Sequence, residues 1–282
     1  MANQYHANAF AIAGASTGES TMNRVWVFLF CVVFTACGTA PVVTSPARMA
    51  AERSHRMALQ AIQDGRVQSA EGEWQQALRG YQAIDDWRGQ GMARLGLAQA
   101  SQRLGRSFQA EQTLLPMLQD GYFLPEQQVQ AALQLAQLIW RQDLPRAQQL
   151  LAQARLNCAA PCFVAVQMDN LAAQIALEQG DVSTAAQLAA QALDLAAERP
   201  AEHAFALRLL AEVALRQGRW FDDAERALMQ AIDLDRQSAE PMWLLDDYRL
   251  LLSIAKRKGD VALEKKAQAH LASLCAAIEC SP

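Results

Sequence analysis

Four cysteines of this 282-residue chain stand in two close pairs, and they are the residues whose chemistry is easiest to specify. Cys158 and Cys162 enclose the run CAAPC, and Cys275 and Cys280 enclose CAAIEC. Outside the reducing cytosol, pairs this close in sequence are expected to form two short-range disulfides. One would close a turn that contains Pro161, and the other would fasten the carboxyl end. A redox site is the alternative, but its usual spacing places two residues between the cysteines, and neither pair has that spacing.

Other catalytic or metal-binding arrangements are not found in the sequence. There is no Gly-rich phosphate loop, no His pair of the zinc-protease type and no Ser in a nucleophile-elbow setting. The histidines at positions 55, 203 and 270 have no ligand-like spacing. Three pairs of adjacent acids are expected near helix starts, where carboxylates cap free amides, rather than in general acid–base work: Asp85 and Asp86, Asp222 and Asp223, Asp246 and Asp247. The sequence therefore predicts a protein that is not an enzyme and that binds no cofactor and no metal.

The composition favours helices packed on helices. Hydrophobic residues make up 52% of the chain, but only 7% of its residues are aromatic, and alternating runs of Val, Ile and Thr are nearly absent. A core built from small and aliphatic side chains is typical of helical proteins and excludes a β-sandwich or barrel. The net charge of −4 gives no basic face for nucleic acid.

A short apolar run near the amino terminus has the layout of an export signal. It extends from Val25 to Phe34, follows Arg24, and is followed by small residues. A run of about ten residues is too short to cross a bilayer, which takes about twenty. Residues 34–37 read FTAC and resemble the lipobox of bacterial lipoproteins, in which the signal is cut before a lipid-bearing Cys; Phe34 stands where Leu is usual. The resemblance implies lipidation of Cys37, and a soluble periplasmic protein cut nearby is the alternative.

The chain is expected to divide into three regions. Residues 1–36 hold an amino-terminal extension and the signal, with Met22 as the better candidate for the start because residues 1–21 contain Glu19 and no Lys or Arg. Residues 37–47 form a lipidated tether with the small residues and prolines of a linker. Residues 48–282 form the folded domain. With Gly38 directly after the Cys, the sequence resembles that of lipoproteins sent to the outer membrane. The predicted location is therefore the periplasmic face of the outer membrane.

A repeat of about 40 residues organises the chain from residue 48 onward. Six turn positions are spaced by 40, 37, 38, 38 and 41 residues: Gly65, Gly105, Gln142, Gly180, Gly218 and Gly259. Glycine ends a helix by accepting left-handed backbone. Five residues after the first four turns comes an alanine, which lets two antiparallel helices approach closely: Ala70, Ala110, Ala147 and Ala185. One such hairpin cannot bury its own apolar stripe, so six stacked hairpins are predicted, with the divergent sixth as a polar cap.

These units resemble the tetratricopeptide-repeat (TPR) superfamily in its longer-helix form, over roughly residues 48 to 274. The resemblance implies an all-α fold, a right-handed α-solenoid of about six helical hairpins. In TPR proteins the first helix of each unit lines a concave groove that holds a peptide or a partner helix. Carried over to this sequence, the groove-facing positions are Gln99, Arg103, Asn170, Gln174, Arg208, Glu212, Arg249 and Ser253.

This candidate groove is a mixed polar surface. It lacks the paired Lys and Asn with which some TPR proteins clamp a terminal carboxylate, and ordinary solvent exposure is the alternative for each residue. Tryptophans at helical spacing are expected in the core rather than in a ligand site: Trp74, Trp140, Trp220 and Trp243.

The predicted function is that of a non-catalytic adaptor in the periplasm, anchored to the outer membrane by its lipid. It would bind a segment of another envelope protein in the groove during envelope or pilus and secretin assembly. No nucleic acid and no small-molecule substrate are expected as partners. Two alternatives remain: an enzyme that acts on the cell wall, or its direct regulator, and a self-associating scaffold.

Overall fold

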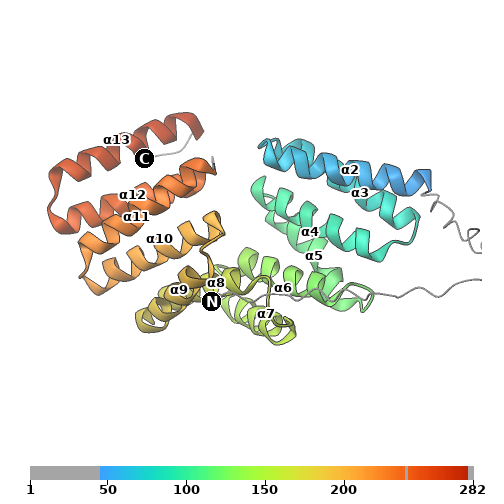
Figure 1. Ribbon diagram of the computed structural model, residues 1–282, viewed down its shortest axis with the longest axis horizontal. Coiled ribbons are helices and arrows are strands. Elements are labelled where there is room, and N and C mark those ends of the chain that lie inside the picture. The colour runs from blue at the N-terminus through green and yellow to red at the C-terminus, as the bar shows by residue number, and fades with distance from the viewer. Residues whose placement is uncertain (1–44, 239–240, 279–282) are drawn as a thin grey trace, which may run out of the picture. The chain divides into compact units, whose positions relative to one another are not determined.

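The computed structural model describes residues 45–238 and 241–278, and within these ranges the chain forms helices and no strand (Figure 1). The twelve helices of the described ranges are α2 (Pro46–Gln63), α3 (Val67–Ala83), α4 (Trp87–Arg103), α5 (Ser107–Gln119), α6 (Pro125–Ile139), α7 (Leu144–Asn157), α8 (Ala165–Glu178), α9 (Val182–Leu195), α10 (Pro200–Gln217), α11 (Phe221–Gln237), α12 (Pro241–Lys258) and α13 (Val261–Ile278). Paired in chain order, they make six hairpins, as the repeat predicts.

The predicted signal, the lipidation site Cys37 and most of the tether lie outside the described residues. The first helix begins at Pro46, two residues before the predicted start of the domain, and Ser45 caps it by accepting a hydrogen bond from the Arg48 backbone N–H at 3.1 Å. None of the helices in the described ranges is both long and apolar enough to cross a membrane.

Local sequence sets where the helices begin and end. Asp86, Asp143 and Asp181 each accept a hydrogen bond from the backbone N–H three residues on, at 2.9 to 3.1 Å, which satisfies a free amide of the first turn. The five turn glycines have left-handed backbone, with φ between 68° and 80°: Gly65, Gly105, Gly180, Gly218 and Gly259. The third hairpin lacks this glycine, and its turn relies on Asp143 and on Pro145 in the first turn of α7.

The repeat positions form the contacts within each hairpin. The alanines five or six residues after the turns are at most 3% exposed, which confirms the spacing argument: Ala70, Ala110, Ala147, Ala185 and Ala224. The first two hairpins also approach each other closely, because the buried Trp74 ring of α3 packs on the backbone of Gly96 in α4. The hydrophobic core crosses hairpin boundaries, because α4 takes part in two clusters of buried side chains. Its Leu97 belongs to the cluster with α2 and α3, and its Leu95 belongs to the cluster with α5 and α6.

The first helices of the hairpins also contact one another. Contacts join α2 to α4, α4 to α6, α8 to α10 and α10 to α12, whereas second helices of neighbouring hairpins make no comparable contact within the described ranges. The first helices therefore share one face of the stack. The pair α6 and α8 lacks such a contact, and the chain between their hairpins contains the Cys158–Cys162 loop.

Candidate functional site

A cleft of about 420 Å³ lies along the first helices of five hairpins. Its volume falls in the range of ligand-binding clefts, roughly 300 to 1,000 Å³. Its lining is rich in side-chain amides and aromatic rings: Gln99 and Gln102 of α4, Gln137 of α6 with Trp140 after it, Gln167, Asn170, Leu171 and Gln174 of α8, Ala201, Glu202 and Phe205 of α10, and Trp243 of α12.

The cleft crosses the first helices obliquely. At α4 and α6 it is lined by residues near the carboxyl ends of the helices, such as Gln102 and Trp140. At α10 and α12 it is lined by residues near the amino ends, such as Glu202 and Trp243. A ligand that follows the cleft therefore contacts a different level of each helix.

Three of the predicted groove residues line this cleft, namely Gln99, Asn170 and Gln174. Others lie on the same helices outside it. Arg103 is the last residue of α4, and Glu212 of α10 pairs with Arg216 at 3.2 Å.

The two groove residues predicted on α12 also lie outside the cleft lining. Arg249 lies 4.0 Å from the carboxylate of Asp246, and the hydroxyl of Ser253 donates to the Arg249 carbonyl at 3.0 Å. Both residues belong to the middle of α12, whereas the cleft reaches only the first turn of that helix at Trp243.

Arg208 corrects the prediction for α10, because it lies in a buried ion cluster instead of facing the cleft. Its guanidinium donates to Asp247 of α12 at 2.5 Å and to Asp235 of α11. The two carboxylates are fully buried, and Arg208 is 12% exposed. Three helices of two hairpins are thus joined by one cation and two acids.

Burial dominates the titration of this cluster. It raises the pKa of Asp235 to about 7, with Arg208 opposing the rise and Asp247 adding to it. Burial likewise raises the pKa of Asp247, again opposed by Arg208. Two carboxylates that share one guanidinium leave an uncompensated buried charge, so the cluster favours retention of one proton near neutral pH.

The expected helix-start positions of the acid pairs hold for two of the three. Asp86 caps α4, and Asp222 and Asp223 lie in the first turn of α11. The third pair is a correction, because Asp246 and Asp247 lie beyond the first turn of α12, and Asp247 belongs to the buried cluster.

The tryptophans occupy three different environments, so the prediction of a common core role is partly wrong. Trp74 lies in the core, 3% exposed, with the His55 ring edge-on at a centroid distance of 4.6 Å. Trp140 is 9% exposed and borders the cleft, as does Trp243. Trp220 is 61% exposed and precedes α11 in left-handed backbone, so it is not a core residue.

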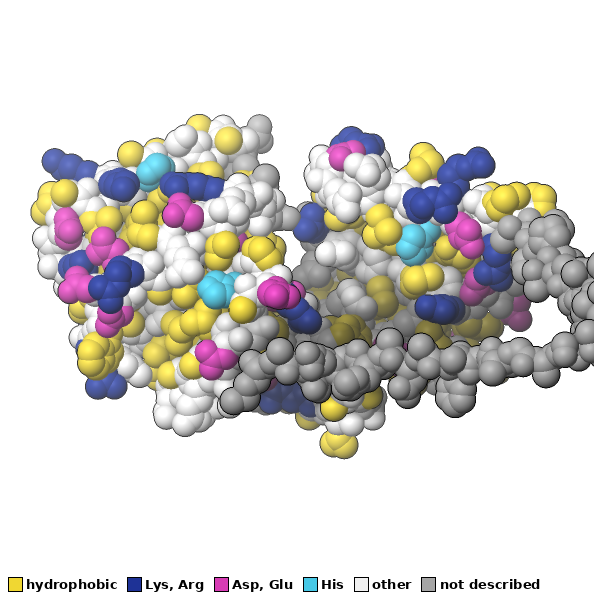
Figure 2. All heavy atoms as spheres, viewed as in Figure 1, with side chains coloured by type: hydrophobic (Ala, Val, Ile, Leu, Met, Phe, Trp, Pro, Cys, Tyr) yellow, Lys and Arg dark blue, Asp and Glu magenta, His cyan; other side chains and the backbone are white. Residues whose placement is uncertain are grey.

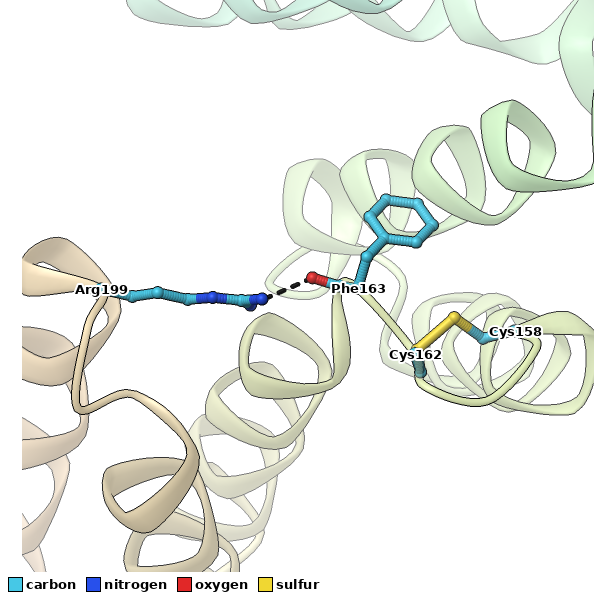
Figure 3. Close-up of a disulfide and its surroundings, with 4 residues drawn as sticks. All are labelled: Cys158, Cys162, Phe163 and Arg199. Carbon is cyan, nitrogen blue, oxygen red and sulfur yellow. Dashed lines mark hydrogen bonds between the residues drawn. A yellow bond between two sulfur atoms is a disulfide. The ribbon is translucent and has the colours of Figure 1, made fainter. Parts of the chain in front are cut away.

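None of the cysteines in the described ranges lines the cleft. Cys158 and Cys162 are joined across the turn between α7 and α8, and the Arg199 side chain donates to the Phe163 carbonyl beside them at 3.0 Å (Figure 3). Cys275 of α13 is also disulfide-bonded, and its predicted partner Cys280 lies outside the described residues.

Groupings of His, Cys, Asp and Glu that could hold a metal ion are absent from the described ranges. On the face shown in Figure 2, acidic and basic side chains are interspersed.

Sequence reasoning missed most of the cleft lining. Gln102, one turn beyond Gln99 on the same helix face, had a usable signal, because residues three apart share a face. No pattern in the sequence marks Gln137, Glu202 and Phe205 as lining residues. The level at which the cleft crosses α6 and α10 depends on how the hairpins stack.

Comparisons with known proteins support the fold. No protein-family model matches the chain, and no curated protein matches it. The crystal structure of BtubC (BKLC) from P. vanneervenii is similar, with a TM-score of 0.53 and 15% sequence identity over 85% of this chain and 94% of that one.

Two crystal structures of TPR-like repeats, named as a kinesin light chain of Podosopora anserina, match with TM-scores of 0.38 and 0.37. Their identities are 14% and 16%, over 84% and 85% of this chain and 100% of theirs. The fold is an all-helical, TPR-like repeat solenoid, and the likeness concerns the fold alone.

Proposed function

We propose that this chain is a non-catalytic scaffold that holds a segment of a partner polypeptide in the cleft of its first helices. The observation that carries the proposal is that five hairpins contribute to the cleft, so no hairpin contains it alone. A site assembled along a repeat array suits a ligand that runs across several units. TPR-like repeats suggest this kind of protein interaction.

The chemistry of the lining supports binding rather than reaction. Its side chains are amides, aromatic rings and small apolar groups, and Glu202 is the one ionisable residue among them in the described ranges. The Glu202 carboxylate already accepts a hydrogen bond from Gln167 at 2.6 Å. General acid–base work needs a second, convergent group near such an acid.

We further propose that the scaffold is a lipoprotein of the outer membrane that faces the periplasm, and that its partner is another envelope protein. This part rests on the sequence of residues 22–38 alone. A test compares Cys37→Ser with Cys31→Ser by membrane fractionation of cells, because Cys31 lies within the apolar run of the signal and only Cys37 stands at the cysteine position of the lipobox. We expect Cys37→Ser to leave the membrane fraction and Cys31→Ser to stay; equal retention of both would contradict the anchor.

The binding function is tested by photo-crosslinking in cells that make the full chain. A photoreactive amino acid replaces Gln102 or Gln174 in the cleft, or Gln149 on α7 as a matched exposed glutamine outside it. We expect the two cleft positions to yield an adduct with the same polypeptide and Gln149 to yield none. Adducts of equal yield at all three positions, or no adduct from the cleft, would refute the proposal.

A further inference from the structure

The one ionisable side chain among the described lining residues is Glu202. Glu202 accepts from Gln167 through its carboxylate, and its backbone carbonyl accepts from the Asn170 amide at 3.1 Å. These two bonds join α8 to α10 at the edge of the cleft. No Lys or Arg is among the lining residues. An acidic group that enters a partly desolvated cleft needs a positive charge to offset its lost hydration, and this lining offers none.

Four glutamine amides in the cleft have no hydrogen-bond partner within the described ranges: Gln99, Gln102, Gln137 and Gln174. Each primary amide offers two N–H donors and one carbonyl acceptor, the same groups as a peptide bond. An extended chain presents its backbone N–H and C=O groups outward, so such amides can pair with it. A helical partner has already used those groups internally, and it would leave the glutamines unpaired.

A buried acceptor points to a donor on the ligand. Asn170 is 5% exposed, and its Nδ2 atom is committed to the Glu202 carbonyl. This bond fixes the orientation of the amide, and its Oδ1 atom is left without a partner in the part of the chain that the structure describes. A buried acceptor without a donor is unfavourable, and a backbone N–H of a bound segment relieves that cost.

Two of the aromatic rings in the lining also lie against an arginine. The Arg141 guanidinium lies 4.8 Å from the centroid of the Trp140 ring, and the Arg208 guanidinium lies 5.5 Å from that of Phe205. Rings braced in this way lose little freedom when a ligand binds. Flat apolar side chains, namely aromatic residues and proline, match this wall best.

We propose that the cleft takes an extended polypeptide segment that has no acidic residue and carries an aromatic residue or proline, read through backbone hydrogen bonds to the glutamine amides. This inference rests on the proposed function and specifies its ligand.

The test uses the full chain, purified in mild detergent, and a phage-displayed library of random dodecapeptides. Affinities of the selected peptides are measured by fluorescence anisotropy at low and high salt. We expect core motifs with Trp, Tyr, Phe or Pro and without Asp or Glu, and those that also lack Lys and Arg should bind with equal affinity at both salt concentrations. Gln102→Ala and Gln174→Ala should each weaken binding about three- to tenfold, the effect of losing one or two hydrogen bonds. Gln149→Ala, the matched control, should change nothing.

Three kinds of result would overturn the inference, and they show separately whether the proposed function holds. Selected peptides that depend on Gln102 and Gln174 but carry acidic core motifs would refute the inference alone. Peptides indifferent to both substitutions, or no selected peptide, would refute the proposed function as well. A chito-oligosaccharide that displaces the selected peptides would show a glycan site and would also refute the inference.

Discussion

Gly96→Ala tests the close packing of the first two hairpins, on which the stack depends. A Cβ atom at this position would lie 2.2 Å from the Trp74 ring, far inside van der Waals contact. The ring cannot simply move away, because Trp74 is 3% exposed and His55 packs against it. Overpacking of this kind costs about 1 to 3 kcal/mol, and a rigid neighbour places the cost near the upper end. Alanine returns about 1 kcal/mol of helix propensity, so we expect a net loss of about 2 kcal/mol.

Gly72→Ala on α3 is the matched control, since it is also an interior helical glycine but has no atom within 4 Å of the added Cβ. It should gain about 0.5 to 1 kcal/mol. The assay is urea unfolding of the full chain, followed by far-UV circular dichroism. With a typical slope of about 2 kcal/mol per M, the two midpoints should differ by roughly 1 M or more. If Gly96→Ala is as stable as Gly72→Ala, helices α3 and α4 are not packed as described.

Three further predictions concern the ion cluster and the disulfide. Asp235 holds a proton up to about pH 7 in the folded protein, whereas an unfolded aspartate loses its proton near pH 4. The free energy of unfolding should therefore fall as pH rises through this window. Asp235→Asn should flatten the fall in the urea midpoint between pH 5 and pH 8, and Asp233→Asn, at an exposed position of the same helix, should not. Arg208→Met leaves two buried carboxylates without a cation and should cost about 3 to 5 kcal/mol in the same assay; a loss below about 1 kcal/mol would contradict the buried cluster. Cys158→Ser removes the disulfide that closes a short loop and should lower the free energy of unfolding by about 2 kcal/mol relative to the oxidised parent. An unchanged urea midpoint would contradict a structural role for this disulfide.

The fold was predictable because its requirements are local and recur. Left-handed turns favour glycine, as at Gly65 and its equivalents, and close helix packing favours alanine, as at Ala70 and its equivalents. Because each hairpin has the same requirements, the same residue types recur at the same positions of the repeat. The third hairpin could still be placed, because Gln142 keeps the register after the glycine is lost, and Asp143 caps the next helix.

The site was only partly predictable because it depends on contacts between hairpins. Gln99, Asn170 and Gln174 were found from their places on first helices. The oblique path of the cleft decides that Trp243 lines it while Ser253 does not, and that path is set by how each hairpin stacks on the last. Arg208 was misplaced for the same reason, since its two acids come from other helices.

The proposed function places the partner segment in the cleft of the first helices. Two tryptophans test it most directly, because Trp243 lines the cleft and Trp220 lies exposed beside a separate hollow between α10 and α11. The measurement is the affinity of a selected dodecapeptide for Trp243→Ala and for Trp220→Ala, by fluorescence anisotropy. We expect Trp243→Ala to weaken binding about tenfold or more, as loss of an aromatic anchor does, and Trp220→Ala to leave it unchanged. Equal losses, or a loss confined to Trp220→Ala, would contradict the claim.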